Sequence, residues 1–182
     1  MIYVFLADGF EEIEALAPVD ILRRLGLGVK TVAIKGCSAV GSHGIEVKCD
    51  IKADEFKPDE NLEAVILPGG MPGSVNLFES ETVKNALEFA DKNGRLMCAI
   101  CAAPFVLGRL GYLKGKKATC FPGFEKDLEG AQTVTGCPAV TDGNVITARG
   151  AGAALEFGAA IGAYFKGKEQ ADEVLRGMQW RI

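Results

Sequence analysis

The sequence contains one histidine, His43, among its 182 residues. This scarcity excludes metal centres that need two or three imidazole ligands, and the six cysteines are too scattered to form a zinc site alone. Positive charge is also in short supply, because 20 lysines and arginines accompany 24 acidic residues and the formal charge is −4. Binding to nucleic-acid phosphates needs a basic surface. We therefore expect neither a metal ion nor a nucleic-acid partner.

Long apolar runs are absent as well. A membrane-spanning helix needs about 20 apolar residues, and the segment 1–6 lacks the basic start of a signal peptide. We therefore expect a cytoplasmic protein with reduced cysteines and no membrane partner. Apolar residues make up 48% of the chain and charged residues 24%, which is ordinary for a globular protein. Because no linker-like segment divides it, residues 1–182 are predicted to form one domain.

Several apolar runs have the length and uniform character of strands that are buried on both faces of a sheet. They span residues 2–7, 29–34, 64–67 and 95–100, with further candidates at 117–120, 133–135 and 144–147. Helical patterns lie at 12–25, 153–165 and 168–178, and residues 38–51 are predicted to form a hairpin. The alternation predicts a doubly wound α/β domain with a mostly parallel central sheet and helices on both faces. The buried face of the first helix is expected to carry Ile13, Leu16, Ala17, Ile21 and Leu22.

Ligands of doubly wound sheets bind beyond the carboxyl ends of the strands. Cys101 lies at such a point, where a strand-like run ends and a helix-like run begins with Pro104 in its first turn. Helix N-terminal amides and the helix dipole favour a thiolate there, and the small Ala102 leaves room for a substrate. These features predict a nucleophile, although a buried cysteine that acts only as a small apolar residue remains the alternative.

Cys98 and Cys101 together form a Cys-x-x-Cys pair, which raises the alternative of a redox disulfide. Residues three apart along a strand point to opposite faces, so a disulfide would require a rearranged turn. We therefore interpret Cys98 as a core residue.

Gly69 and Gly70 follow the predicted strand 64–67 and expose their backbone amides. Such amides can hold a negative oxygen next to a nucleophile, and a simple tight turn is the alternative. Three glutamates, Glu11, Glu12 and Glu14, follow the first strand at the same edge. Acidic residues in a first helical turn often only complement the dipole. Glu14 lies off the centre of the apolar face, where partial burial would raise its pKa and allow a protonated carboxyl group to hydrogen-bond a thiolate.

Five ordered segments resemble the ThiJ/PfpI superfamily, in particular its branch of parkinsonism-associated deglycases and YajL-like proteins. They are residues 6–14, 18–24, 67–70, 99–104 and 148–152, the last followed by Glu156 and Phe157. The resemblance covers nearly the whole chain. It implies a flavodoxin-like sandwich, a homodimer, and Cys101 and Glu14 as the catalytic pair. It also implies backbone amides of Gly70 and Ala102 around an oxyanion, with Gly69, Arg149 and Gly150 as further lining of the site.

The resemblance implies a cofactor-free enzyme of glyoxalase or deglycase type, which acts on methylglyoxal or glyoxal, free or as early adducts on proteins. The thiol would form a hemithioacetal with the aldehyde, and Glu14 would move the proton that leads to a 2-hydroxy acid. A redox-regulated chaperone or oxidative-stress sensor that oxidises Cys101 is the alternative. A thiol protease or amidase is a weaker one, because Ala102 stands where protease-like relatives have histidine and His43 lies in the predicted hairpin, where we expect a surface residue.

Overall fold

A seven-stranded sheet forms the centre of the computed structural model, which describes residues 1–180. Its strand order is β10-β11-β7-β6-β1-β2-β5. The strands are β1 (Ile2–Leu6), β2 (Val29–Ala33), β5 (Ile51–Lys52), β6 (Ala64–Leu67), β7 (Leu96–Ile100), β10 (Ala139–Asp142) and β11 (Val145–Ala148). All neighbours pair in parallel except β10, which runs antiparallel to β11. The predicted mostly parallel sheet is confirmed, while the antiparallel edge strand β10 was not predicted.

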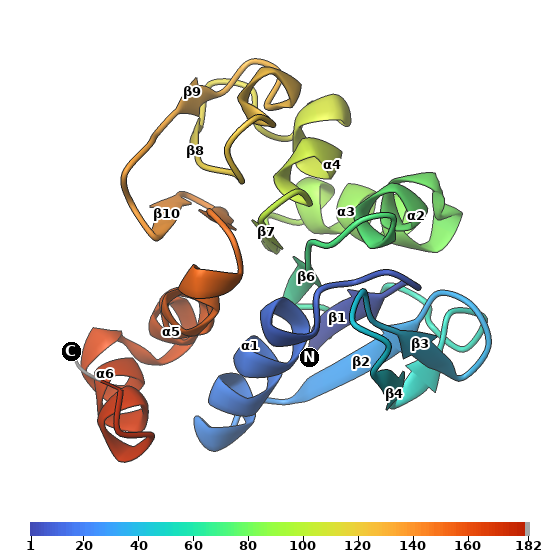
Figure 1. The fold of residues 1–182 in the computed structure, drawn as a ribbon, viewed down its shortest axis with the longest axis horizontal. Helices are drawn as coiled ribbons and strands as arrows, with labels where there is room; N and C mark the ends of the chain where they lie inside the picture. Colours follow the sequence, from blue (N-terminus) through green and yellow to red (C-terminus); the bar gives the residue numbers. More distant parts are fainter. Residues whose placement is uncertain (181–182) are drawn as a thin grey trace.

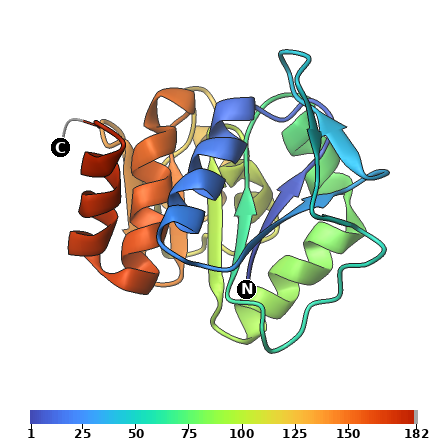
Figure 2. The same cartoon turned by 90° about the horizontal axis from the view of Figure 1, so that it is seen from below.

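Helices cover both faces of this sheet (Figure 1). One face carries α1 (Glu12–Arg24) and α5 (Ala154–Lys166), with α6 (Lys168–Gly177) beside α5, and these three helices lie side by side in Figure 2. The other face carries α2 (Gly73–Glu79), α3 (Glu81–Lys92) and α4 (Pro104–Arg109). The order β2-β1-β6-β7-β11 within the sheet is that of flavodoxin-like folds. The predicted doubly wound sandwich is therefore confirmed.

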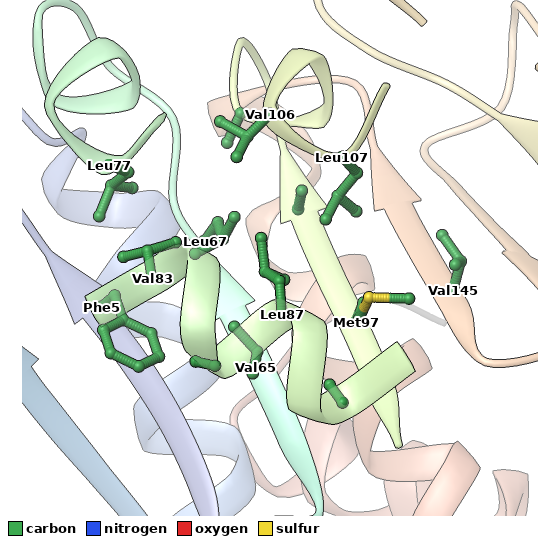
Figure 3. Close-up of a cluster of buried hydrophobic side chains, with 14 of the residues drawn as sticks. Phe5, Val65, Leu67, Leu77, Val83, Leu87, Met97, Val106, Leu107 and Val145 are labelled. Carbon is green, nitrogen blue, oxygen red and sulfur yellow. The ribbon is translucent and has the colours of Figure 1, made fainter. Parts of the chain in front are cut away.

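The strands alternate their apolar side chains between two buried clusters. Phe5, Val65 and Met97 point toward α3 and α4, in the cluster shown in Figure 3. Val4 and Cys98, one position away, belong to the cluster beneath α1 and α5. Each fully buried side chain of this size stabilises the fold by about 1.5–3 kcal/mol. The same alternation places the Cys98 thiol in the core, which agrees with its interpretation as a core residue.

Smaller elements complete the described part of the chain. β3 (Ser38–Val40) and β4 (Glu46–Lys48) form the predicted hairpin, but Ile51 belongs to the edge strand β5 and not to the hairpin. β8 (Lys117–Ala118) and β9 (Gln132–Thr133) are shorter than predicted and pair with each other in a separate sheet. Two short 3₁₀ turns, η1 (Glu125–Asp127) and η2 (Ala151–Ala153), lie in the loops. Among residues 1–180, no helix has the length and apolar character to cross a membrane.

The prediction for the buried face of α1 was wrong at its first turns. Ile13 is 56% exposed and Leu16 is 37% exposed, whereas Glu14 is completely buried. The helix is thus turned so that a carboxyl group, rather than the flanking apolar side chains, points into the protein. The reason is a hydrogen bond from the Gly69 amide, which compensates part of the cost of burying this group.

Candidate active site at Cys101

Cys101 directly follows β7, which lies between the parallel strands β6 and β11. Its amide donates a hydrogen bond of 2.9 Å to the carbonyl of Ala148, the last residue of β11. Its backbone has φ +64°, a left-handed conformation that is rare for a residue with a side chain and is found preferentially at functional sites. Pro104 then opens α4, as predicted. The strained turn holds the thiol at the carboxyl edge of the sheet, half-buried.

Gly69, in the loop after β6, fits between Glu14 and Cys101. A Cβ atom at Gly69 would lie 2.5 Å from Glu14 Oε2 and 2.6 Å from the Cys101 Cβ. Both distances are far below van der Waals contact, so a side chain has no room there. The bare backbone brings the carboxyl group and the thiol within reach of each other. Its amide donates to Glu14 Oε2 at 2.9 Å.

Glu14 is fully buried, and its two carboxyl oxygens have different surroundings. Oε2 accepts the hydrogen bond from Gly69, while Oε1 makes no hydrogen bond of ordinary geometry within residues 1–180. Burial raises the pKa of Glu14 to about 7, opposed by its interactions with Cys101 and the Gly69 amide. An orphaned buried oxygen next to a thiol is the arrangement expected of a group that takes up and releases a proton.

The Cys101 thiol does not have the low pKa that its position before a helix predicted. Burial raises its pKa to about 12, and the negative charge of Glu14 adds to the rise. Hydrogen bonds from the amides of Ala102 and Gly70 act in the opposite direction but are outweighed. The following helix, α4, spans only six residues, which limits the contribution of its dipole.

Glu14 and Cys101 therefore titrate as a pair and not as two independent groups. A proton on Glu14 removes its repulsion of a thiolate and provides a third donor beside the two amides. When the pair holds one proton in total, either the carboxyl group or the thiol is ionised. Below pH about 7 the pair gains a second proton.

The two further residues expected to line the site differ in their placement. Gly150 is buried and faces the Cys101 thiol, since a Cβ atom there would lie 4.0 Å from Cys101 Sγ. Arg149 is exposed, and its amide donates to the carbonyl of Pro138. Within residues 1–180, Arg149 therefore lies next to Gly150 in sequence but makes no hydrogen bond to Cys101.

Phe121 is a neighbour of Cys101 that the sequence did not indicate. Its amide donates a hydrogen bond of 2.8 Å to the carbonyl of Cys101. The residue follows the two-residue strand β8 and lies twenty positions beyond Cys101, so neither spacing nor periodicity relates the two.

The other two glutamates after β1 serve a different purpose from Glu14. Glu12 Oε2 lies 2.9 Å from Nδ1 of His43, and Glu12 Oε1 accepts the His43 amide at 2.8 Å. Glu11 and Ser42 complete this group, with Ser42 Oγ 3.1 Å from Glu11 Oε2. The ligand-type atoms of Glu11, Glu12 and His43 lie within 4.8 Å of one another. The hydrogen bonds of His43 with Glu12 and of Ser42 with both glutamates account for this closeness. The group fastens the hairpin to α1, and His43 is exposed, as expected.

A hollow of about 680 Å³ lies away from Cys101, beyond the ends of β2 and β5, and is lined by residues that include Lys35, Cys37 and Lys52. Its lining lacks a buried acid paired with a nucleophile. We therefore locate the candidate site by its chemistry, at Cys101, and not by the size of the hollow.

Comparison with known proteins finds similar sequences and structures. The profile of the DJ-1/PfpI family matches residues 1–163. Protein dj-1beta of Drosophila melanogaster is 37% identical over 177 residues, which cover 96% of this chain and 94% of the fly protein. A protein named as a deglycase from Pyrococcus abyssi is 33% identical over 153 residues, covering 81% and 89% of the two chains. The structure of oxidized DJ-1 from Toxoplasma gondii has a TM-score of 0.94 at 29% identity, covering 100% of this chain and 98% of that one.

Proposed function

Because the chain belongs to the DJ-1/PfpI family, we propose that it is a cofactor-independent cysteine enzyme of glyoxalase or deglycase type. Its substrates are small 2-oxoaldehydes, R–CO–CHO, such as glyoxal and methylglyoxal, free or as early adducts on proteins. One observation carries the proposal: a buried carboxyl group and a thiol form a pair, and two backbone amides point at the sulfur. The name of the archaeal relative supports it.

The first step is addition of the thiol to the aldehyde. As Cys101 Sγ bonds to the aldehyde carbon, the thiol proton passes to Glu14, and the π electrons of the carbonyl move onto oxygen. The amides of Gly70 and Ala102 stabilise that oxygen as it gains charge. Glu14 then gives this proton to the oxygen, which yields a hemithioacetal and leaves Glu14 as a carboxylate.

The second step moves a hydrogen between the two carbons of the substrate. Glu14 removes the proton from the former aldehyde carbon and passes it to the ketone oxygen, which gives an enediol. The neighbouring carbon then takes up a proton, while the hydroxyl group on the former aldehyde carbon loses its proton and becomes the thioester carbonyl. The product is a thioester of a 2-hydroxy acid on Cys101. Water hydrolyses this thioester and releases the acid and the thiol.

The sum of these steps is R–CO–CHO plus water giving R–CHOH–COOH. One carbon is oxidised and its neighbour is reduced, so the electrons balance within the substrate. No external oxidant, reductant or cofactor is required. Peptide cleavage is a poorer match, because it needs an acid to protonate a departing amine. The one histidine, His43, lies on the hairpin and is hydrogen-bonded to Glu12 of α1.

The test is formation of lactate from methylglyoxal by the purified protein without glutathione, in the presence and absence of EDTA. We expect lactate at equal rates in both, and none above background with the Cys101→Ser variant. Cys101-dependent cleavage of a peptide substrate without consumption of methylglyoxal would instead establish a protease.

A second candidate function is oxidative sensing, with a redox-regulated chaperone activity. The amides at the Cys101 sulfur would also hold the oxygens of a sulfinate, and a protonated Glu14 would donate to one of them. The oxidized state named for the Toxoplasma gondii relative supports this candidate. Mild peroxide should then add oxygen at Cys101, and protection of a client protein from aggregation should change with that oxidation while dicarbonyl turnover is absent.

We also propose that two copies of the chain associate through α1 and the hairpin. Ile13 and Leu16 on α1 are exposed apolar side chains, as are Val40 and Ile45 next to them on the hairpin. Ile45 lies close to α1, because its amide approaches Glu12 Oε1 at 3.5 Å. Apolar side chains gathered in this way are typical of protein interfaces.

A further inference from the structure

Phe121 places an aromatic ring at the entrance to the nucleophile. Its side chain is 47% exposed, which is unusual for phenylalanine, yet its backbone is held by the hydrogen bond to the Cys101 carbonyl. A turn follows directly, with the Phe124 amide donating to the Phe121 carbonyl at 3.1 Å. The position of the ring is therefore tied to the turn that carries the thiol.

Gly150 brings the ring and the sulfur close together. A Cβ atom at Gly150 would lie 3.2 Å from Phe121 Cδ2 and 4.0 Å from Cys101 Sγ. Phe121 Cδ2 and Cys101 Sγ thus border the same small space, which stays open because Gly150 has no side chain. The ring forms one wall of it.

The remaining surroundings of the sulfur show which part of a substrate this volume receives. The Glu14 carboxyl group and the amides of Gly70 and Ala102 act on the Cys101 sulfur, and the proposed function assigns the aldehyde oxygen and the migrating proton to them. The substituent R has no polar partner to find among them. The open side of the site, over Gly150 and against Phe121, is left for this substituent.

We propose that Phe121 is a specificity-determining residue, which packs against R and directs the enzyme to 2-oxoaldehydes whose substituent is aromatic or bulky and apolar. The inference rests on the proposed function and narrows its substrate class. Two aromatic rings in contact gain attraction beyond simple burial, whereas the methyl group of methylglyoxal covers little of the ring. An aryl glyoxal is therefore the better substrate.

The test compares kcat/KM for phenylglyoxal, which yields mandelate, with kcat/KM for methylglyoxal, which yields lactate. We expect the wild-type protein to favour phenylglyoxal. Phe121→Ala should lower the ratio of the two values by about tenfold, chiefly through KM for phenylglyoxal, because only binding of the substituent is lost. Phe121→Leu should lie between them.

Phe124→Ala is the matched control, since it removes a ring from the same loop that stacks on Phe105 and not on the thiol side. It should leave the ratio within about twofold of wild type. An unchanged ratio in Phe121→Ala, or an equal fall in Phe124→Ala, would overturn the inference.

A second measurement separates this inference from the proposed function. If the wild-type protein converts neither aldehyde, the proposed function fails, and the rates of Cys101 modification by N-phenylmaleimide and N-methylmaleimide test the wall directly. Peptide mapping follows Cys101 alone. A phenyl-to-methyl rate ratio that falls in Phe121→Ala supports the aromatic wall, and an unchanged ratio rejects it.

Discussion

The amide of Gly69 donates a 2.9 Å hydrogen bond to Glu14 Oε2, across 55 positions of the sequence. This bond joins the exit of β6 to the first turn of α1. It holds one carboxyl oxygen in place and leaves Oε1 buried without such a bond in the described chain. This oxygen belongs to the group that we propose as the proton carrier.

Replacement of Glu14 by glutamine should lower the turnover of methylglyoxal by about 100-fold or more, because an amide cannot exchange the migrating proton. Lactate formation under saturating substrate measures the effect. Glu11→Gln is the matched control, since Glu11 lies in the same turn but contacts Ser42, and it should change the rate only a few-fold. Full activity of Glu14→Gln together with loss in Glu11→Gln would show that the wrong carboxylate was chosen.

Alkylation of Cys101 by iodoacetamide should accelerate as the pH rises through about 7, where the pair loses the first of its two protons. In Glu14→Gln the rise should move to higher pH, because burial still raises the thiol pKa and no neighbouring base remains. Peptide mapping at each pH gives both profiles. Coincident profiles would contradict the coupling of the two groups.

The buried carboxyl group should also make stability depend on pH. The pKa of Glu14 is raised from 4.5 to about 7 in the fold, so its contribution is fully present below pH 4.5 and is lost as the pH rises through 7. Glu14→Gln cannot ionise and avoids this loss. The free energy of unfolding of Glu14→Gln minus that of the wild type should therefore increase by about 2–3 kcal/mol between pH 4.5 and pH 8.5. A difference that stays constant with pH, measured by urea unfolding, would refute the raised pKa.

The Glu12–His43 contact should be strongest at intermediate pH. Burial acts to raise the pKa of Glu12, but hydrogen bonds, first of all from the His43 side chain, hold it at about 2. The same hydrogen bond raises the pKa of His43. The contact is therefore lost as the pH falls from 4.5 toward 2, and again as it rises through the pKa of His43. Carboxyl NMR should find the Glu12 pKa higher in His43→Gln, and an unaltered value would show that the imidazole is not responsible.

Sedimentation at micromolar concentration should give twice the chain mass of 19.3 kDa, as expected for a dimer. Ile13→Glu places a charge on the exposed apolar face of α1 and should shift the protein toward monomer. Tyr164→Glu alters a similarly exposed side chain on α5 and serves as the control. A wild-type monomer would refute the proposed association.

The main features of the fold follow from strand and helix periodicity. The uniform apolar runs predicted β1, β2, β6 and β7 to within one residue at each end, because strands covered on both faces leave a pattern of their own. Residues 73–92 were not assigned, although they form α2 and α3. The start of α3 depends on Ser80, whose hydroxyl accepts from the Val83 amide at 3.4 Å, and such a cap is a weak signal beside a long apolar run.

The parts of the candidate site whose position is determined by the ends of strands could be predicted from the sequence. Cys101 and Gly69 follow strands, and parallel strands end at one edge. The burial of Glu14 was underestimated, since the spacing of Ile13 and Leu16 indicated a different inner face for α1. Helical periodicity indicates which apolar residues share a face, but it does not indicate which carboxyl group accepts a hydrogen bond from a distant segment. Phe121 was missed because its link to Cys101 is a main-chain hydrogen bond between distant segments.

The two outer strands of the sheet are short, and this has a consequence for solubility. β5 offers two residues, Ile51 and Lys52, to a neighbour, and β10 offers four. On the β10 side, Asp142 accepts the amide of Lys117, so the short strand β8 lies next to that strand. Unpaired backbone groups on long sheet edges recruit strands from other molecules and start aggregation. Edges this brief give an incoming strand few hydrogen bonds, so a partly opened molecule has little template for fibril growth.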